Sequence, residues 1–322
     1  MDGAWIPDIL GRPFEQLALP LGDDDEGPVG ATLVRSEPSW LERVGRPLAD
    51  VDVLYTHGWS DYFFQTELAR FWTQRGARFF ALDLRKHGRS LRPGQTPGYV
   101  TDLDVYDADI AAALDVIGSR RRLVLMAHST GGLTMTLWAA RHPGVASALV
   151  LNSPWLELQL GALVRQAVSP LVGLGARLAP RGAQPLVDLG HYTRAQAAIG
   201  SLPNGPAEWR PARGFPTHPG WLAAVLAGHQ RVTGGVDVGC PTLLILSARS
   251  SSPFARTDVD AESTDTVLAV DNIARSATRI GSLVTIARVD GAIHDVFLSR
   301  PEPRQAAYLT LERWLPLIAA AP

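Results

Sequence analysis

The chain alternates between short apolar runs and amphipathic segments over residues 51–151. Four runs typical of buried strands lie at 51–56, 78–83, 123–127 and 148–151. Between the second and third runs, apolar residues at positions 103, 106, 110, 114 and 117 recur every three or four residues, which is typical of one face of a helix. This alternation predicts repeated βαβ units, and therefore an α/β fold with a mostly parallel sheet covered by helices on both faces.

The alternation stops after residue 154, and a strand pattern resumes only at 242–247. The intervening stretch is rich in Pro, Gly and Trp, and Pro170 should divide its apolar beginning, 156–178, into two helical pieces. We predict a core formed by residues 1–154 and 236–322 and a helical cap, or lid, inserted at 155–235. A helical pair merely packed on the domain would give the same pattern. Beyond the insertion we expect a helix at 270–277, a strand at 283–287 and a final helix at 302–318.

The composition narrows the class of protein. The 322 residues are 46% hydrophobic and 19% charged, a balance typical of a folded globular chain. Thirty basic against 32 acidic residues leave a formal charge of −2, which argues against nucleic acid or an anionic membrane as a partner. The single cysteine, Cys240, excludes an intrachain disulfide and a multi-cysteine metal site. The acidic turn at 23–26 is expected to be a solvated loop.

The N-terminal residues carry no basic segment followed by an apolar run, and no stretch of about 18 uncharged apolar residues occurs in the chain. We therefore expect a cytoplasmic protein without stable membrane insertion. A free thiol fits that compartment. The sequence leaves a homodimer open.

A serine stands where a predicted strand meets a predicted helix. The strand 123–127 runs into H-S-T-G-G at 128–132, so Ser129 occupies the turn of a nucleophile elbow, with Ala127 in place of the first glycine. Small flanking residues are needed because backbone crowds the serine in this strained turn. We interpret Ser129 as a catalytic nucleophile; the alternative is an incidental serine in a structural turn.

A serine nucleophile needs a base, and the base needs an acid that orients its imidazole. In folds with this elbow the chain order is serine, acid, histidine. His294 lies in a loop of small residues after the last predicted strand and is the predicted base. Asp265 is the predicted acid because it leads straight into a helix, whereas residues 248–254 hold no carboxylate. Asp258 and Asp260 remain alternatives.

Acyl transfer also needs N–H donors for the tetrahedral oxyanion. One comes from the residue after the nucleophile and one from the loop after the first core strand, which are Thr130 and Trp59. Gly58 lets the backbone turn so that the Trp59 amide faces the site. The alternative for Trp59 is an aromatic residue packed at a loop. The predicted substrate pocket is lined by His57, His128, Trp155 and Leu156.

Four segments resemble those of the α/β-hydrolase superfamily, and more narrowly its monoacylglycerol lipase, lysophospholipase and serine-aminopeptidase-like branch. They are H-G-W at 57–59, L-D-L-R-K-H-G-R-S at 82–90, H-S-T-G-G at 128–132 and H-D at 294–295. The resemblance covers nearly the whole chain from about residue 30. It implies a Ser–Asp–His triad, an oxyanion hole at the two positions above, a cap between the sixth and seventh strands, and no cofactor. The loop at 248–264 is longer than the usual connection to the acid.

These features predict a serine hydrolase that cleaves carboxylic esters of small molecules through an acyl-enzyme on Ser129. The apolar start of the cap favours lipid-like or aryl esters, of the monoacylglycerol or lysophospholipid type. Haloalkane dehalogenases and epoxide hydrolases of this fold need a carboxylate at the elbow, so Ser129 argues against both. A peptidase or amidase of the same fold remains an alternative, as does a hydrolase-fold ligand-binding protein with little turnover.

Overall fold

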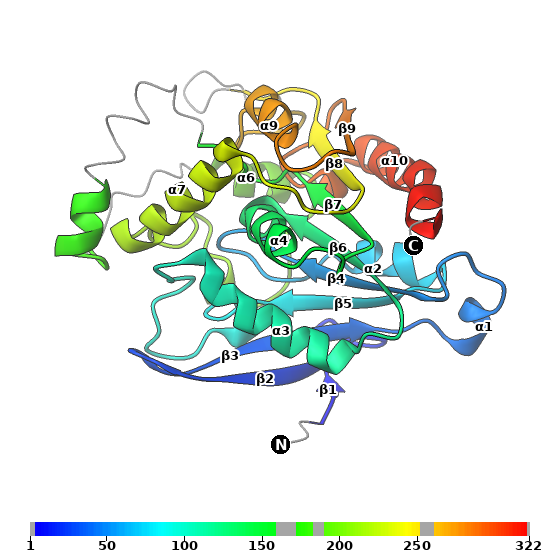
Figure 1. The fold of residues 1–322 in the computed structure, drawn as a ribbon, viewed down its shortest axis with the longest axis horizontal. Helices are drawn as coiled ribbons and strands as arrows, with labels where there is room; N and C mark the ends of the chain where they lie inside the picture. Colours follow the sequence, from blue (N-terminus) through cyan, green and yellow to red (C-terminus); the bar gives the residue numbers. More distant parts are fainter. Residues whose placement is uncertain (1–3, 159–171, 183–189, 252–260, 321–322) are drawn as a thin grey trace.

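One twisted sheet organises the molecule (Figure 1). The computed structural model describes residues 4–158, 172–182, 190–251 and 261–320. Within these ranges nine strands pair in the order β1-β2-β3-β5-β4-β6-β7-β8-β9, antiparallel from β1 through β5 and parallel from there to β9. The strands are β1 (Ile6–Pro7), β2 (Glu15–Asp24), β3 (Gly27–Ser36), β4 (Val51–Thr56), β5 (Arg78–Asp83), β6 (Arg122–His128), β7 (Ala148–Asn152), β8 (Thr242–Ser247) and β9 (Val284–Val289). The predicted α/β fold with a mostly parallel sheet is confirmed.

Helices cover both faces of this sheet, with α3, α4, α7 and α9 on one side and α2 and α10 on the other (Figure 1). The α-helices are α1 (Trp40–Arg43), α2 (Thr66–Thr73), α3 (Tyr106–Ile117), α4 (Ser129–Arg141), α6 (His191–Ala198), α7 (Pro219–Gly234), α9 (Val270–Ala277) and α10 (Pro301–Ala320). Short 3-10 turns lie at Gly88–Ser90, Leu103–Val105, Ala207–Trp209 and Val296–Leu298. None of the helices in the described ranges has the length and apolarity needed to cross a membrane.

The hydrophobic core lies in two layers, one against each face of the sheet. Successive strand residues point to opposite faces, so Leu54 and Leu125 enter one layer while Val53 and Val124 enter the other. All four side chains are completely buried. A strand buried on both faces is apolar at nearly every position, which is why β4, β5 and β8 coincide with the predicted runs.

The acidic turn at 23–26 joins β2 to β3 and is not the solvated loop that its charge predicts. The Lys86 ammonium lies 2.6 Å from a carboxylate oxygen of Asp24 and 2.6 Å from one of Glu26, and only 2% of the lysine side chain is exposed. Glu26 also accepts hydrogen bonds from Thr96. The prediction is therefore wrong for Asp24 and Glu26, because a buried cation distant in sequence binds them.

The predicted insertion at 155–235 contributes α6 and α7 to the described part of the chain. Helix α7 packs on the core so closely that a Cβ added at Gly228 would lie 3.0–3.2 Å from three leucine side chains of the layer beneath. Most of the segment 156–178, with the predicted break at Pro170, lies outside the described residues. The division into core and cap stays a prediction.

Candidate active site

Ser129 stands at the junction of β6 and α4 with a backbone φ of +52°, which L-residues rarely adopt. The turn is possible because its neighbours are small. A Cβ added at Gly131 would lie 2.2 Å from the carbonyl oxygen of His57, and one added at Gly132 would lie 2.6 Å from the Pro154 side chain. The strained serine and the glycines that surround it have the geometry of the nucleophile elbow that the sequence predicts.

A hydrogen-bond chain joins the three residues predicted as nucleophile, base and acid. His294 Nε2 lies 3.0 Å from Ser129 Oγ, and His294 Nδ1 lies 2.9 Å from Asp265 Oδ2. The other oxygen of Asp265 accepts the backbone N–H groups of Val267 and Leu268, each at 2.7 Å. The structure thus brings Ser129, His294 and Asp265 together with the connectivity of a charge-stabilised imidazole base.

Burial and backbone hydrogen bonds fix the position of Asp265, the predicted acid. Asp265 is completely buried at the start of the segment that leads into α9, and its N–H and C=O groups bond to residues 249 and 251. The two alternatives weighed from the sequence, Asp258 and Asp260, lie outside the described residues. Among those described, Asp265 is the carboxylate bonded to His294.

The predicted oxyanion loop lies directly against the nucleophile. A Cβ added at Gly58 would lie 2.9 Å from Ser129 Cβ, so only glycine fits there without displacement. His57 Nε2 accepts the Leu84 N–H at 3.1 Å, so the ring proton is on Nδ1, which donates to the Gly58 carbonyl at 2.8 Å. This bond holds the Gly58–Trp59 peptide plane. Since N–H and C=O of a trans peptide point in opposite directions, the Trp59 N–H is directed away from the His57 ring.

The second predicted donor, the Thr130 N–H, lies in the first turn of α4. The first N–H groups of a helix have no partner within the helix and carry the positive end of its dipole. The elbow therefore places amides without an intrahelical partner beside the serine hydroxyl. Trp59 and Thr130 occupy positions from which both N–H groups can serve one oxyanion, and that role stays a prediction.

The four predicted pocket residues surround the elbow. His57 is buried and bonds backbone groups through both ring nitrogens. The His128 ring lies 4.8 Å from that of His294, and burial lowers the pKa of His128 to about 4, so it is neutral at pH 7. The backbone N–H of Trp155 donates to the Ser129 carbonyl oxygen at 2.9 Å, and the Leu156 side chain is completely buried. Their role as pocket walls stays a prediction.

The indole of Trp59 packs against aromatic side chains from the stretch 155–235. Its ring centre lies 3.7 Å from that of Trp221 and 5.6 Å from that of Phe215. Trp155 lies 6.1 Å from Trp221 on the same side. These aromatic side chains therefore form a continuous cluster beside the loop that follows β4. Within it, Trp221 and Phe215 are buried, each with 2% of its surface exposed.

Sequence reasoning missed a second buried carboxylate beside the histidine. Asp295 accepts a 2.6 Å hydrogen bond from the Asn152 side chain, at the end of β7, and a 3.1 Å bond from the Gln65 side chain, before α2. The Asp295 N–H donates to the Tyr192 hydroxyl at 3.2 Å, and the Tyr192 ring lies 5.5 Å from that of His294. Three distant segments thus hold the loop that carries His294. Only the H-D pair at 294–295 could have drawn attention to it.

A buried ion pair connects the oxyanion loop to the stretch 155–235. Arg210 donates to Asp61 at 3.0 Å, and each side chain is 9% exposed. Burial raises the pKa of Asp61 above its usual range, and the charge of Arg210 opposes that shift. No group of three or more His, Cys, Asp or Glu side chains that could hold a metal ion occurs in the part of the chain that the structure describes.

Known proteins with similar sequences are hydrolases and haloperoxidases. Residues 49–249 match the family described as serine aminopeptidase, S33. Lysophospholipase L2 of Escherichia coli (strain K12) is 28% identical over 206 residues, which are 58% of this chain and 59% of the relative. A non-heme haloperoxidase of Rhodococcus erythropolis is 38% identical over 113 residues, which are 34% of this chain and 37% of the relative. The matched region thus spans less than two thirds of either relative.

Solved structures share the fold over almost the whole chain. A soluble variant of monoglyceride lipase from Saccharomyces cerevisiae superposes with a TM-score of 0.66 at 15% identity, covering 94% of this chain and 97% of that one. The monoacylglycerol lipase of Paleococcus ferrophilus gives 0.64 at 18% identity, with coverages of 89% and 98%. With the family match over more than half of its length, the chain belongs to the serine aminopeptidase (S33) family of the α/β-hydrolase superfamily.

Proposed function

We propose that the protein is a serine hydrolase that cleaves carboxylic esters through an acyl-enzyme on Ser129. The observation that carries this proposal is the buried hydrogen-bond chain from Ser129 Oγ through the His294 imidazole to Asp265, at 3.0 and 2.9 Å. Its serine occupies a strained elbow at the start of a helix, whose first N–H groups have no partner within the helix. Nucleophile, base, orienting acid and oxyanion donors are the parts that acyl transfer requires.

In the first half of the reaction, Ser129 Oγ attacks the ester carbonyl carbon while His294 Nε2 takes the hydroxyl proton. Asp265 stays ionised and stabilises the imidazolium through Nδ1. The Trp59 and Thr130 N–H groups bind the negative charge on the former carbonyl oxygen. When the tetrahedral intermediate collapses, the C–O bond to the alcohol breaks and His294 returns its proton to the leaving oxygen.

In the second half, water replaces the alcohol. His294 Nε2 removes a proton from the water as its oxygen attacks the acyl carbonyl, and the same donors bind the oxyanion. Collapse breaks the bond to Ser129 Oγ, which recovers its proton from His294. The products are a carboxylic acid and an alcohol, and no step needs a cofactor.

The surroundings of the site favour an apolar or aryl ester over a peptide with a free amino terminus. An aminopeptidase needs a carboxylate available for the substrate ammonium group. Asp61 and Asp295, the carboxylates closest in sequence to the oxyanion loop and to the base, are engaged by Arg210 and by two side-chain amides. The aromatic surface of Trp59 and Trp221 instead offers apolar contact.

The test combines covalent labelling with an ester and amide panel. Wild-type protein, Ser129→Ala and a matched control, Ser282→Ala, are incubated with a fluorophosphonate probe. Ser282 is exposed in the loop before β9, so its substitution leaves the elbow intact. All three are then assayed on p-nitrophenyl esters of increasing chain length and on p-nitroanilides, including aminoacyl ones.

We expect wild type and Ser282→Ala to be labelled and to hydrolyse the esters, and Ser129→Ala to do neither while keeping its circular dichroism spectrum. The chain-length optimum would define the size of the acyl site. Faster turnover of aminoacyl anilides than of esters would replace the esterase proposal by the peptidase alternative. Labelling and turnover that survive Ser129→Ala would refute the nucleophile assignment, and saturable ester binding without turnover would favour the ligand-binding alternative.

A further inference from the structure

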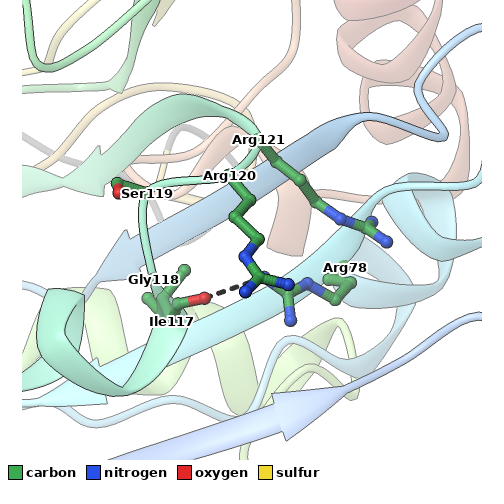
Figure 2. Close-up of a pocket in the computed structure, with 6 residues that line it drawn as sticks. All are labelled: Arg78, Ile117, Gly118, Ser119, Arg120 and Arg121. Carbon is green, nitrogen blue, oxygen red and sulfur yellow. Dashed lines mark hydrogen bonds between the residues drawn. The ribbon is translucent and has the colours of Figure 1, made fainter.

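An open pocket of about 570 Å³ lies at the edge of the sheet opposite Ser129. Figure 2 shows its lining, where α3 ends and the chain turns into β6. Six residues form it, and we call it the arginine pocket: Arg78, Ile117, Gly118, Ser119, Arg120 and Arg121. Strand β6 runs from this edge to the elbow, and its seven residues at about 3.3 Å each separate the pocket from Ser129 by roughly 20 Å. The pocket is therefore distinct from the site already described.

The pocket holds more positive charge than its own carboxylates neutralise. Arg78 takes both oxygens of Asp52, at 2.7 and 2.6 Å, and also donates to the Ile117 carbonyl at 2.9 Å, the bond drawn in Figure 2. Next to the pocket, Arg122 takes both oxygens of Asp50. Each of these two carboxylates therefore binds one arginine through both oxygens; with Arg120 and Arg121 beside them, Arg78 and Arg122 make a cluster of four arginines.

The other two arginines keep unused donors. Arg121 Nη1 is buried without a hydrogen-bond partner among the described residues, and its ion pair with Asp52 Oδ1 is long, at 4.0 Å. The exposed Arg120 forms no hydrogen bond or ion pair with any described residue. In Figure 2 the guanidinium groups of Arg78, Arg120 and Arg121 all extend to one side of the loop 118–121. Four guanidinium groups against two carboxylates leave a local charge of +2.

Unpaired guanidinium groups are costly to hold together, and a buried N–H donor without an acceptor loses its hydration without compensation. At the carbonyl end of α3, the Ile117 carbonyl accepts from Arg78. A bound anion would supply acceptors to both free arginines at once. The planar fork of arginine matches the oxygens of phosphate and carboxylate groups.

We propose that the arginine pocket binds the phosphate group of a phosphomonoester. A dianion balances the local charge of +2, whereas a carboxylate would leave half of it. The pocket is several times larger than a phosphate group, so the ester's organic part fits beside the loop 118–121. The inference is independent of the esterase proposal, since none of the pocket residues belongs to the Ser129 site.

Calorimetric titration of the full chain at low ionic strength tests the proposal, with inorganic phosphate and glycerol 3-phosphate as probes and glycerol as the uncharged control. The variant Arg120→Gln/Arg121→Gln removes the two guanidinium groups that keep unused donors. A second double variant, Arg70→Gln/Arg213→Gln, removes the same charge from exposed arginines elsewhere. Because Arg121 is partly buried, the single variant Arg120→Gln provides the test should the double variant unfold.

We expect one saturable site for phosphate and for glycerol 3-phosphate, weakened about tenfold or more in the pocket variant and less than about twofold in the charge-matched control. Sedimentation with phosphatidylcholine vesicles, with and without phosphatidic acid, identifies the source of the group. Pocket-dependent binding to phosphatidic acid but not to glycerol 3-phosphate would assign the site to a lipid headgroup. Equal affinity of wild type and pocket variants, or no saturable binding of either soluble probe or of phosphatidic acid vesicles, would overturn the proposal.

Discussion

Replacing Asp265 by asparagine should abolish catalysis through the tautomer of His294 and leave the fold intact. Asp265 Oδ1 accepts two backbone N–H groups at 2.7 Å, and Oδ2 faces His294 Nδ1. An asparagine has one oxygen and one amide nitrogen in the same positions. The oxygen must face the two backbone donors, since turning the nitrogen towards them would place donors against donors. The NH2 group is therefore forced towards His294.

An NH2 group opposite Nδ1 requires Nδ1 to accept, so the neutral imidazole carries its proton on Nε2. That tautomer cannot accept the proton of Ser129 Oγ. The loss expected for a wrong tautomer in such a triad is about 10⁴-fold in kcat, or about 5.5 kcal/mol of transition-state stabilisation. Stability should change by only about 1 kcal/mol, because all the buried donors keep acceptors.

Asp265→Ala separates the two effects. It removes the acceptor of the Val267 and Leu268 N–H groups, of which the Leu268 N–H is buried, and should lower the free energy of unfolding by about 2 kcal/mol. The assay is kcat on a p-nitrophenyl ester together with urea unfolding. Asp258→Asn and Asp260→Asn are the matched controls and should retain wild-type kcat. A kcat for Asp265→Asn within tenfold of wild type would refute the tautomer argument.

Three further substitutions test other contacts. Gly58→Ala places a Cβ 2.9 Å from Ser129 Cβ and should lower kcat by about 10 to 100-fold in steady-state assays with a retained fold. Asn152→Ala removes the 2.6 Å bond to the aspartate after the base and should lower kcat about tenfold with KM unchanged. Burial raises the pKa of Glu26, but hydrogen bonds from Lys86 and Thr96 outweigh it and lower the pKa from the usual 4.5 to about 2. The ionised Glu26 therefore stabilises the folded state above pH 4.5, and this stabilisation is lost as the pH falls towards 2. Lys86→Met should therefore lower the free energy of unfolding by about 2 kcal/mol at pH 7. In urea unfolding, its difference from wild type should shrink as the pH falls from 4.5 towards 2.

The parts of the site that sequence predicts are those set by local backbone geometry. A strand, a small-residue turn and a helix in succession determine where Ser129 lies, and chain order within a parallel sheet brings the loops after β8 and β9 to the same edge. Asp265 is predictable as the acid because it directly precedes a helix. In the structure this position lies within hydrogen-bond distance of His294. The strands β4, β5 and β8 are also predictable locally, since each is a short and mostly apolar run.

The contacts that sequence does not predict join segments far apart in the chain. Lys86 and Glu26 are 60 residues apart, and nothing in a run of acidic residues indicates a buried cation opposite. Asp295 and Asn152 are 143 residues apart, and an asparagine at the end of a strand has many other partners available. The antiparallel strands β1–β3 lie before the βαβ pattern begins. No alternation of strand and helix patterns predicts them.

The stretch 155–235 contacts both halves of the candidate site, so if it selects the substrate as the cap prediction holds, substrate selection and catalytic geometry are coupled. Tyr192 accepts from the backbone of the loop that carries His294, while Arg210 and Trp221 contact the loop that carries the proposed oxyanion donor. A change of side chains in this stretch that enlarged the acyl site would also remove support from the base or from the Trp59 amide. Because a misplacement of about 1 Å at either element costs about two orders of magnitude in rate, substitutions at Trp221 should alter kcat as well as chain-length preference.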